Sequence, residues 1–224
     1  MENNNIQNTD QSIQNTNKPF FSIVICAYNR SIILPRALNS LFDQEYKDFE
    51  ILLVDDGSAD NTYKVYQNFR NKFHLIRYIY QLHKGLPQAR NLGIASSKGK
   101  YITFLDSDDA YESNHLLTRF EILSAHPEVD LLYGGLRIIG NPFVPDKNDP
   151  TKVIHIDKCI IGGTFFFKKE VSKKINGFAD LKYGDDVDFF ERAKKSGAIT
   201  LRTNINTYLY YRDQDDSICN TYSS

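Results

Sequence analysis

The chain has 224 residues, of which 41% are hydrophobic and 13% aromatic, enough apolar material for one large domain with its own core. Lysine and arginine number 27 against 28 aspartate and glutamate residues, which gives a formal net charge of -1. No global positive field exists to hold phosphate backbones, so we expect no nucleic-acid partner.

The number and spacing of the cysteines favour a reducing compartment. Cys26, Cys159 and Cys219 show no close pairing and no Cys-x-x-Cys spacing, which argues against a disulfide framework or a thiolate zinc site and predicts small core fillers.

Residues 1–18, rich in Asn and Gln, are predicted to form a disordered tail before a single domain at 19–224. Apolar runs are far shorter than the roughly 20 residues of a membrane helix, so we expect a cytoplasmic protein without a transmembrane segment and at most peripheral membrane association.

From Phe20 onward, apolar β-branched segments alternate with segments of helical period, the pattern of βαβ units in a mainly parallel sheet. Gly99 is predicted to end one of the helices as a C-cap. The predicted elements are strand Phe21–Ala27, a helical face at Leu34, Leu38 and Leu41, strand Phe49–Val54, helix Thr62–Phe69, strand Leu75–Tyr80, helix Gln88–Ala95, strand Tyr101–Leu105 and helix Ser113–Ala125.

The regular alternation breaks after residue 125. Strands are predicted at Leu131–Tyr133, Thr164–Phe167 and Thr207–Tyr211, and a helix at Asp185–Lys195, so the second half is mixed rather than regularly wound. The stretch Asn141–Thr151 contains three prolines, and either a lid or an ordinary surface connection fits it.

Three acidic clusters lie where an open α/β sheet binds its ligands, at the carboxyl ends of strands or just before helices. The first, Asp55-Asp56-Gly57-Ser58, follows the second predicted strand. A carboxylate there can accept the imide N–H of a uracil or thymine ring. The alternative is a tight Asx turn, which this sequence also favours.

The second cluster, Asp106-Ser107-Asp108-Asp109, directly follows the fourth predicted strand. Two carboxylates separated by one residue at a strand end can point toward one cation, and such hard oxygen ligands suit Mg²⁺ or Mn²⁺ bound together with substrate phosphates. The alternative is that these acids cap the helix predicted from Ser113.

The third cluster, Gly184-Asp185-Asp186-Val187-Asp188, precedes an amphipathic helix. Carboxylates that are crowded or partly desolvated have raised pKa values, and one of these could remove a proton from an attacking hydroxyl. The alternative is ordinary enrichment of acids in a first helical turn. The sequence has no Gly-x-Gly-x-x-Gly after the first strand, no Walker loop, no Gly-x-Ser-x-Gly elbow and no cluster of histidines.

Four segments in this order closely resemble family 2 glycosyltransferases of the GT-A fold, although each alone is a weak signal. The likeness runs from about Phe20 to the last predicted strand. The segments are Ser22-Ile-Val-Ile-Cys-Ala-Tyr-Asn-Arg, Val54-Asp-Asp-Gly-Ser-Ala-Asp-Asn-Thr, Gly85-Leu-Pro-Gln-Ala-Arg-Asn-Leu-Gly and Phe104-Leu-Asp-Ser-Asp-Asp.

This resemblance implies an α/β fold with a Rossmann-like, mainly parallel central sheet flanked by helices and a mixed C-terminal half. Residues 19–112 would form the nucleotide-binding half and 113–224 the acceptor-side half. The resemblance implies an inverting enzyme that transfers one sugar at a time from a nucleotide diphosphate donor, with a UDP-sugar favoured, to a hydroxyl of a carbohydrate or lipid-linked glycan acceptor in surface polysaccharide or glycan synthesis. It implies Mn²⁺ or Mg²⁺ as cofactor, and leaves a homodimer open.

The resemblance also implies site residues. Asp186 would be the general base and Asp185 its acidic neighbour, while Asp108 and Asp106 would bind the metal. The small residues Gly162, Gly163 and Thr164 would lie beside the donor sugar and acceptor. The residues implied in nucleotide binding are Ala27, Tyr28, Asn29, Asp56, Arg90 and Asp106.

Some positions depart from the family pattern. Asp185 stands where Glu is usual, His83 replaces a frequent Asn, and Gln214 falls where many relatives have a metal-binding His, which predicts weaker metal affinity. The chain also lacks the Gln-x-x-Arg-Trp motif of processive synthases. Two alternatives stay open: a haloacid-dehalogenase-like phosphatase, whose Asp-x-Asp motif is imitated at Asp106, and a decayed nucleotide-sugar-binding protein.

Overall fold

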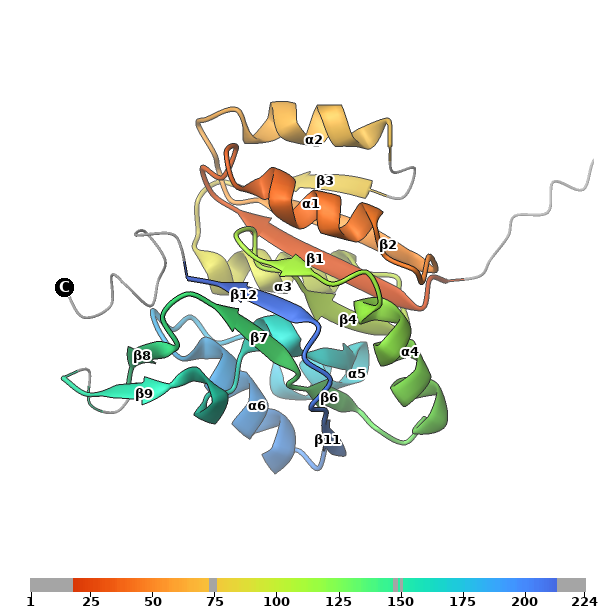
Figure 1. Ribbon diagram of the computed structural model, residues 1–224, viewed down its shortest axis with the longest axis vertical. Helices are drawn as coiled ribbons and strands as arrows, with labels where there is room; N and C mark the ends of the chain where they lie inside the picture. The colour runs from red at the N-terminus through yellow and green to blue at the C-terminus, as the bar shows by residue number, and fades with distance from the viewer. Residues whose placement is uncertain (1–17, 73–75, 147–148, 150, 213–224) are drawn as a thin grey trace, which may run out of the picture.

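The computed structural model describes residues 18–72, 76–146, 149 and 151–212, so Gln214, Cys219 and all but the end of the predicted tail lie outside it. Within these residues, seven strands form a central sheet in the order β11-β6-β10-β4-β1-β2-β3 (Figure 1). Neighbouring strands are parallel except at β10, which is antiparallel to β4 and β6. The strands are β1 (Phe21–Ala27), β2 (Phe49–Asp55), β3 (Ile76–Tyr80), β4 (Tyr101–Phe104), β6 (Leu131–Tyr133), β10 (Phe166–Lys168) and β11 (Thr200–Arg202).

Helices cover both faces of this sheet because residues of its buried strands alternate between two cores. Ile23 and Ile25 of β1 pack in one core with the apolar faces of α1 and α4, whereas Val24 packs in the other core with α3, α5 and α6. This is the three-layer arrangement expected of βαβ units. The helices are α1 (Leu34–Phe42), α2 (Thr62–Arg70), α3 (Leu86–Ser96), α4 (His115–Ala125), α5 (Lys169–Ile175) and α6 (Asp185–Lys195).

The second half adds two small sheets beside the central one (Figure 1). Strand β12 lies between β5 and β7, and β8 pairs with β9 in an antiparallel ribbon. The strand predicted at the end of the chain is therefore present but belongs to a separate sheet. These strands are β5 (Ala110–Tyr111), β7 (Leu136–Ile139), β8 (Phe143–Pro145), β9 (Val153–His155) and β12 (Tyr208–Tyr211).

Two local predictions were wrong, and one alternative is excluded. Ser97, not Gly99, is the C-cap of α3; Gly99 instead lies against β1, where an added Cβ would be 2.5 Å from the backbone nitrogen of Ser22. The strand predicted at Thr164–Phe167 begins only at Phe166, because Gly162–Thr164 form a 3₁₀ turn. The Asp106–Asp109 cluster does not cap α4, because β5 intervenes and Asn114 occupies the N-cap.

Helix α3 approaches β1 closely at Gly93, where an added Cβ would collide with Val24 Cγ1. We expect Gly93→Ala to lower the free energy of unfolding by about 1–3 kcal/mol, because the core cannot absorb the extra methyl group without moving. Thermal melting would show a lower midpoint, by roughly 2–4 °C per kcal/mol. The control is the double variant Val24→Ala/Gly93→Ala, which removes the colliding atoms. Strictly additive losses in the double variant would contradict the collision.

Candidate active site

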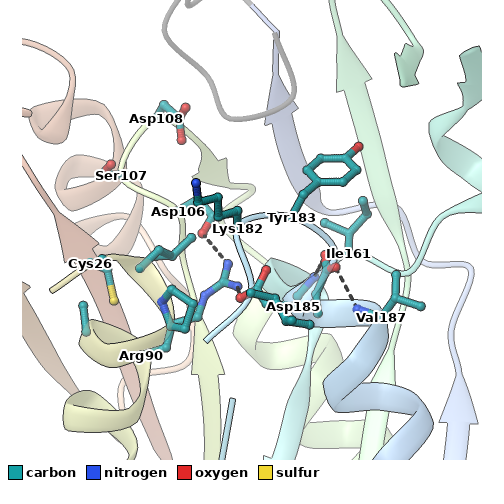
Figure 2. A pocket seen from close by; sticks show the side chains of 18 of the residues that line it. Cys26, Arg90, Asp106, Ser107, Asp108, Ile161, Lys182, Tyr183, Asp185 and Val187 are labelled. Atoms are coloured by element: carbon teal, nitrogen blue, oxygen red, sulfur yellow. Dashed lines mark hydrogen bonds and ion pairs between the residues drawn. The ribbon is translucent and has the colours of Figure 1, made fainter. Parts of the chain in front are cut away.

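A cavity of about 760 Å³ opens at the carboxyl ends of β1, β2 and β4, where the two halves of the chain face each other (Figure 2). Its walls contain four predicted acids that are distant in sequence, Asp56, Asp106, Asp108 and Asp186. Other predicted residues in the wall are Ala27, Tyr28, Arg90, Gly162 and Asp185. The structure therefore brings most of the predicted site residues to one cavity.

Asp56 is 3% exposed and anchors the segment that leads into α3. Its Oδ1 accepts hydrogen bonds from Gln81 Nε2 at 2.6 Å and Lys84 N at 2.9 Å, and its Oδ2 accepts one from Gly85 N at 2.9 Å. His83 Nδ1 also lies 2.9 Å from Oδ2. The carboxylate is thus surrounded by donors, two of which belong to side chains that a ligand could replace.

Two exposed aromatic rings lie beside Asp56 at this end of the cavity. Tyr28 and His83 stack with ring centroids 4.0 Å apart, and 44% of Tyr28 is exposed. Asn29 does not line the cavity; it has a positive φ of 54° and accepts a hydrogen bond from Ala59 N through its side chain. Asn29 therefore holds the loop after β2 against the loop after β1, and its contact with a nucleotide stays a prediction.

Arg90 joins the two halves of the site. Its guanidinium donates to Asp185 Oδ2 at 2.7 Å and to Asp106 Oδ1 at 3.3 Å, as the dashed lines in Figure 2 show. The side chain is buried and lies over the rings of Phe104 and Phe178. Burial disfavours its charge, but Asp185 and Asp106 raise the pKa of Arg90 further above its ordinary value. Arg90 is therefore a fixed cation that is neutralised by acids from β4 and α6.

Asp186 is held differently from its neighbour Asp185. Its Oδ2 accepts from Gly162 N at 3.1 Å and its Oδ1 from Val187 N at 2.8 Å, so backbone groups alone fix its orientation. Gly162 permits this approach, since an added Cβ would be 3.0 Å from Asp186 Cβ. Burial and the charge of Asp185 raise the pKa of Asp186 to about 6, although Arg90 opposes the shift. Such a carboxylate can act as a base near neutral pH.

The sequence cluster after β4 also contains Asp109, whose role the sequence did not indicate. It is 1% exposed and accepts hydrogen bonds from Tyr208 Oη at 2.7 Å and from Tyr211 N at 2.8 Å. Gly163 makes room for Tyr208, because an added Cβ would collide with the hydroxyl. The hydrogen bonds to Asp109 and the space left by Gly163 thus allow β12 to pack beneath the loop that contains Asp106.

The remaining predicted residues are Gly163, Thr164 and two of the cysteines. Gly163 and Thr164 lie outside the cavity wall, and Thr164 Oγ1 accepts from Gly134 N, so their contact with sugar stays a prediction. Among the described residues, Cys26 and Cys159 form no disulfide, and both line the cavity wall. Cys26 also packs against the core that contains Val24, as predicted, whereas Cys159 does not belong to either core. Burial raises the pKa of Cys26 to about 12, so this thiol stays protonated at neutral pH.

The stretch predicted as either a lid or a surface connection contains β8. Val144, Pro145 and Asp146 line the cavity, and Tyr183 Oη donates to Pro145 O at 3.0 Å. The ribbon of β8 and β9 is therefore part of the cavity wall and contacts the segment before α6.

The acids of the site suit a hard divalent cation that is shared with a substrate. No group of three or more His, Cys, Asp or Glu side chains within the described part of the chain is arranged to hold a metal ion. Mg²⁺ needs only one or two protein carboxylates when substrate phosphates complete its shell. Asp106 and Asp108 line the cavity and fit that requirement, whereas Gln214 lies outside the described residues.

The chain matches the family described as Glycosyl transferase family 2 over residues 22–179, more than half of its length, and it belongs to that family. An uncharacterized glycosyltransferase of Rickettsia typhi is 32% identical over 191 residues, which cover 79% of this chain and 59% of that protein. Glycosyltransferase GlyG of Streptococcus pneumoniae is 34% identical over 143 residues, which cover 62% of this chain and 45% of that protein. The chain thus spans about half the length of these relatives.

Solved structures confirm the GT-A fold. TarS of S. aureus, solved with UDP-GlcNAc, has a TM-score of 0.75 at 22% identity, and the match covers 88% of this chain and 60% of TarS. A mannosyltransferase of Pyrobaculum calidifontis, solved with GDP-Man and Mn²⁺, has a TM-score of 0.68 at 18% identity over 87% of this chain and 57% of its own. The predicted mainly parallel sheet and family are therefore confirmed.

Among the described residues, no helix combines the length and apolar character that crossing a bilayer requires.

Asp109 should make stability depend on pH. Burial, together with the charges of Asp106 and Asp108, raises the pKa of Asp109 well above its ordinary 3.8. The native state therefore keeps a proton that the unfolded chain releases, and this contribution to the free energy of unfolding falls as pH rises from about 4 through the raised pKa. We expect wild type to lose stability relative to Asp109→Asn over this range in urea titrations. Parallel pH profiles of the two proteins would contradict the assignment.

Proposed function

We propose that the chain transfers one sugar from a nucleoside diphosphate donor, with a UDP-sugar favoured, to a hydroxyl of a carbohydrate or lipid-linked glycan, with inversion at the anomeric carbon. One observation carries this proposal. Asp186, a carboxylate whose pKa is raised to about 6, lines the same cavity as Asp56, Asp106 and Asp108. A carboxylate that can act as a base therefore lies in the same cavity as carboxylates suited to binding a nucleobase and a divalent cation.

The nucleobase would bind where Tyr28 and His83 stack beside Asp56. Exposed aromatic faces suit stacking with a base. A uracil imide N–H would replace Gln81 Nε2 or His83 Nδ1 as a partner of the Asp56 carboxylate, while the backbone donors keep that carboxylate in place. An acceptor at this position matches uracil, which supports a UDP-sugar as donor.

Asp186 would deprotonate the acceptor hydroxyl. At pH 7 a carboxyl group with a pKa of about 6 is mostly ionised, yet it is a stronger base than an ordinary aspartate. The Gly162 and Val187 N–H groups orient it, and the salt bridge to Arg90 balances the charge of Asp185. The oxygen that loses its proton attacks the anomeric carbon opposite the nucleotide, through an oxocarbenium-like state.

When bound at Asp106 and Asp108, Mg²⁺ or Mn²⁺ would supply positive charge that stabilises the leaving diphosphate. No covalent enzyme intermediate is needed, because the attacking oxygen belongs to the acceptor. The protonated thiol of Cys26 agrees with this, since a neutral thiol is a weak nucleophile.

Family membership favours glycosyl transfer over the phosphatase alternative. The relatives also inform the setting: GgaA of Bacillus subtilis, described as a minor teichoic acid biosynthesis protein, is 30% identical over 200 residues, which cover 80% of this chain and 45% of GgaA. We propose accordingly that the product belongs to a surface polysaccharide or glycan, and that the protein acts in the cytoplasm.

Calorimetric titration with UDP, GDP and dTDP, each with and without Mn²⁺, tests the donor class. We expect UDP to bind most tightly, and its affinity to rise with Mn²⁺ because the cation is shared between the diphosphate and the carboxylates of Asp106 and Asp108. Asp108→Asn should remove most of the Mn²⁺ effect. Failure of all three nucleotides to bind would refute the proposal, whereas binding without transfer or hydrolysis across a broad donor panel would support a decayed binding protein.

Asp186→Asn should lower the rate of transfer by about 10²–10⁴-fold and leave UDP affinity nearly unchanged, because an amide can still accept a backbone hydrogen bond but cannot take a proton. In wild type, kcat/KM should rise with pH through about 6, since the base must be ionised.

Asp188→Asn is the matched control for this variant. Asp188 is in the same helical turn but pairs with Arg192 and lies outside the cavity wall, so transfer should be unaffected. An equal loss of transfer and UDP affinity in Asp186→Asn would contradict the role of base.

A further inference from the structure

A nucleoside diphosphate brings several negative charges into a cavity that already contains acids, so its phosphates need cations. The basic side chains in the cavity wall are Arg30, Arg90, Lys158 and Lys182, together with His83. Arg90 is neutralised by Asp106 and Asp185, and His83 lies against Asp56. Arg30 already takes part in an interaction with another group of the protein. The two lysines of the second half of the chain remain as candidates.

Lys182 lies on segment 180–184, which leads directly into α6. Its side chain is exposed, and the structure records no ion pair or hydrogen bond for it within the described residues. Figure 2 shows this side chain pointing across the cavity toward Asp106 and Asp108, away from Tyr183. An ammonium group there faces the place where the carboxylates of the β4 loop would hold a cation and a diphosphate.

We propose that Lys182 binds the diphosphate of the donor, which deepens the proposed function and rests on it. Phosphate oxygens are strong acceptors, and a flexible lysine supplies a point charge with three donors. The diphosphate would take the place of the carboxylate partner that Lys182 lacks, and the ammonium charge would stabilise the leaving nucleoside diphosphate.

Lys182 is also close in the chain to the proposed base. Lys182 is four residues before Asp186, and Gly184 between them adopts a positive φ of 74° at the N-cap of α6. The same segment is tied to β8 by the bond from Tyr183 to Pro145. A donor bound to Lys182 would therefore contact the same segment, 180–184, that leads into the helix of Asp186 and is hydrogen-bonded to β8.

Lys182→Met tests this inference, since methionine keeps an unbranched apolar side chain and removes the charge. We expect the Kd for UDP to rise about tenfold, the effect of one charge-assisted hydrogen bond, while the Kd for uridine stays unchanged. The UDP affinity of wild type should also fall more steeply with KCl than that of the variant. Lys158→Met is the matched control, because Lys158 is an exposed lysine of the same cavity but follows β9.

Unchanged UDP affinity in Lys182→Met would overturn the inference and leave the proposed function intact. An equal loss of UDP affinity in Lys182→Met and Lys158→Met would also overturn the inference, because the effect would then come from the overall positive charge of the cavity. Failure of wild type to bind UDP at all would remove the proposed function and this assignment together. Equal melting temperatures of the three proteins would show that the comparison concerns binding rather than folding.

Discussion

The buried guanidinium of Arg90 holds this site together. It comes from α3, lies over the rings of Phe104 and Phe178, and pairs with Asp106 after β4 and Asp185 on α6. A charge in such surroundings is costly unless acids compensate it, and removing one member of a buried pair leaves the others uncompensated. The two halves of the chain are therefore fixed relative to each other at the point where a substrate would lie between them.

This ion pair also distinguishes two adjacent carboxylates. Asp185 forms a salt bridge with Arg90, whereas the Asp186 carboxylate accepts hydrogen bonds from the backbone N–H groups of Gly162 and Val187. Burial and the charge of Asp185 then raise the pKa of Asp186 to about 6. A raised pKa on one of two neighbouring acids lets that acid transfer a proton while the other balances a nearby positive charge. Such a division requires a residue without a side chain at position 162, which lets α6 approach the 3₁₀ turn.

The irregular second half of the chain positions residues of the site. Strand β10 enters the sheet antiparallel to β4, so the turn before it, Gly162–Thr164, lies at the end of the sheet where the parallel strands of the first half terminate. Strand β12 in turn supplies Tyr208, whose hydroxyl binds Asp109 beneath the loop of Asp106 and Asp108. The Asp-x-Asp loop is thereby supported from a strand about a hundred residues later in the chain, and that strand precedes the residues outside the described structure.

The sequence by itself determined the elements of the first half, the mainly parallel sheet and the four acids at strand or helix ends, because hydrophobic period and turn chemistry are local properties. Tertiary structure alone decided that Gly99 packs on β1, that Gly163 accommodates Tyr208, that Asp109 is buried, and that Arg90 bridges Asp106 and Asp185. These contacts join residues 16 to 102 positions apart, and no local pattern encodes which distant side chain will compensate a buried charge or fill the space above a glycine.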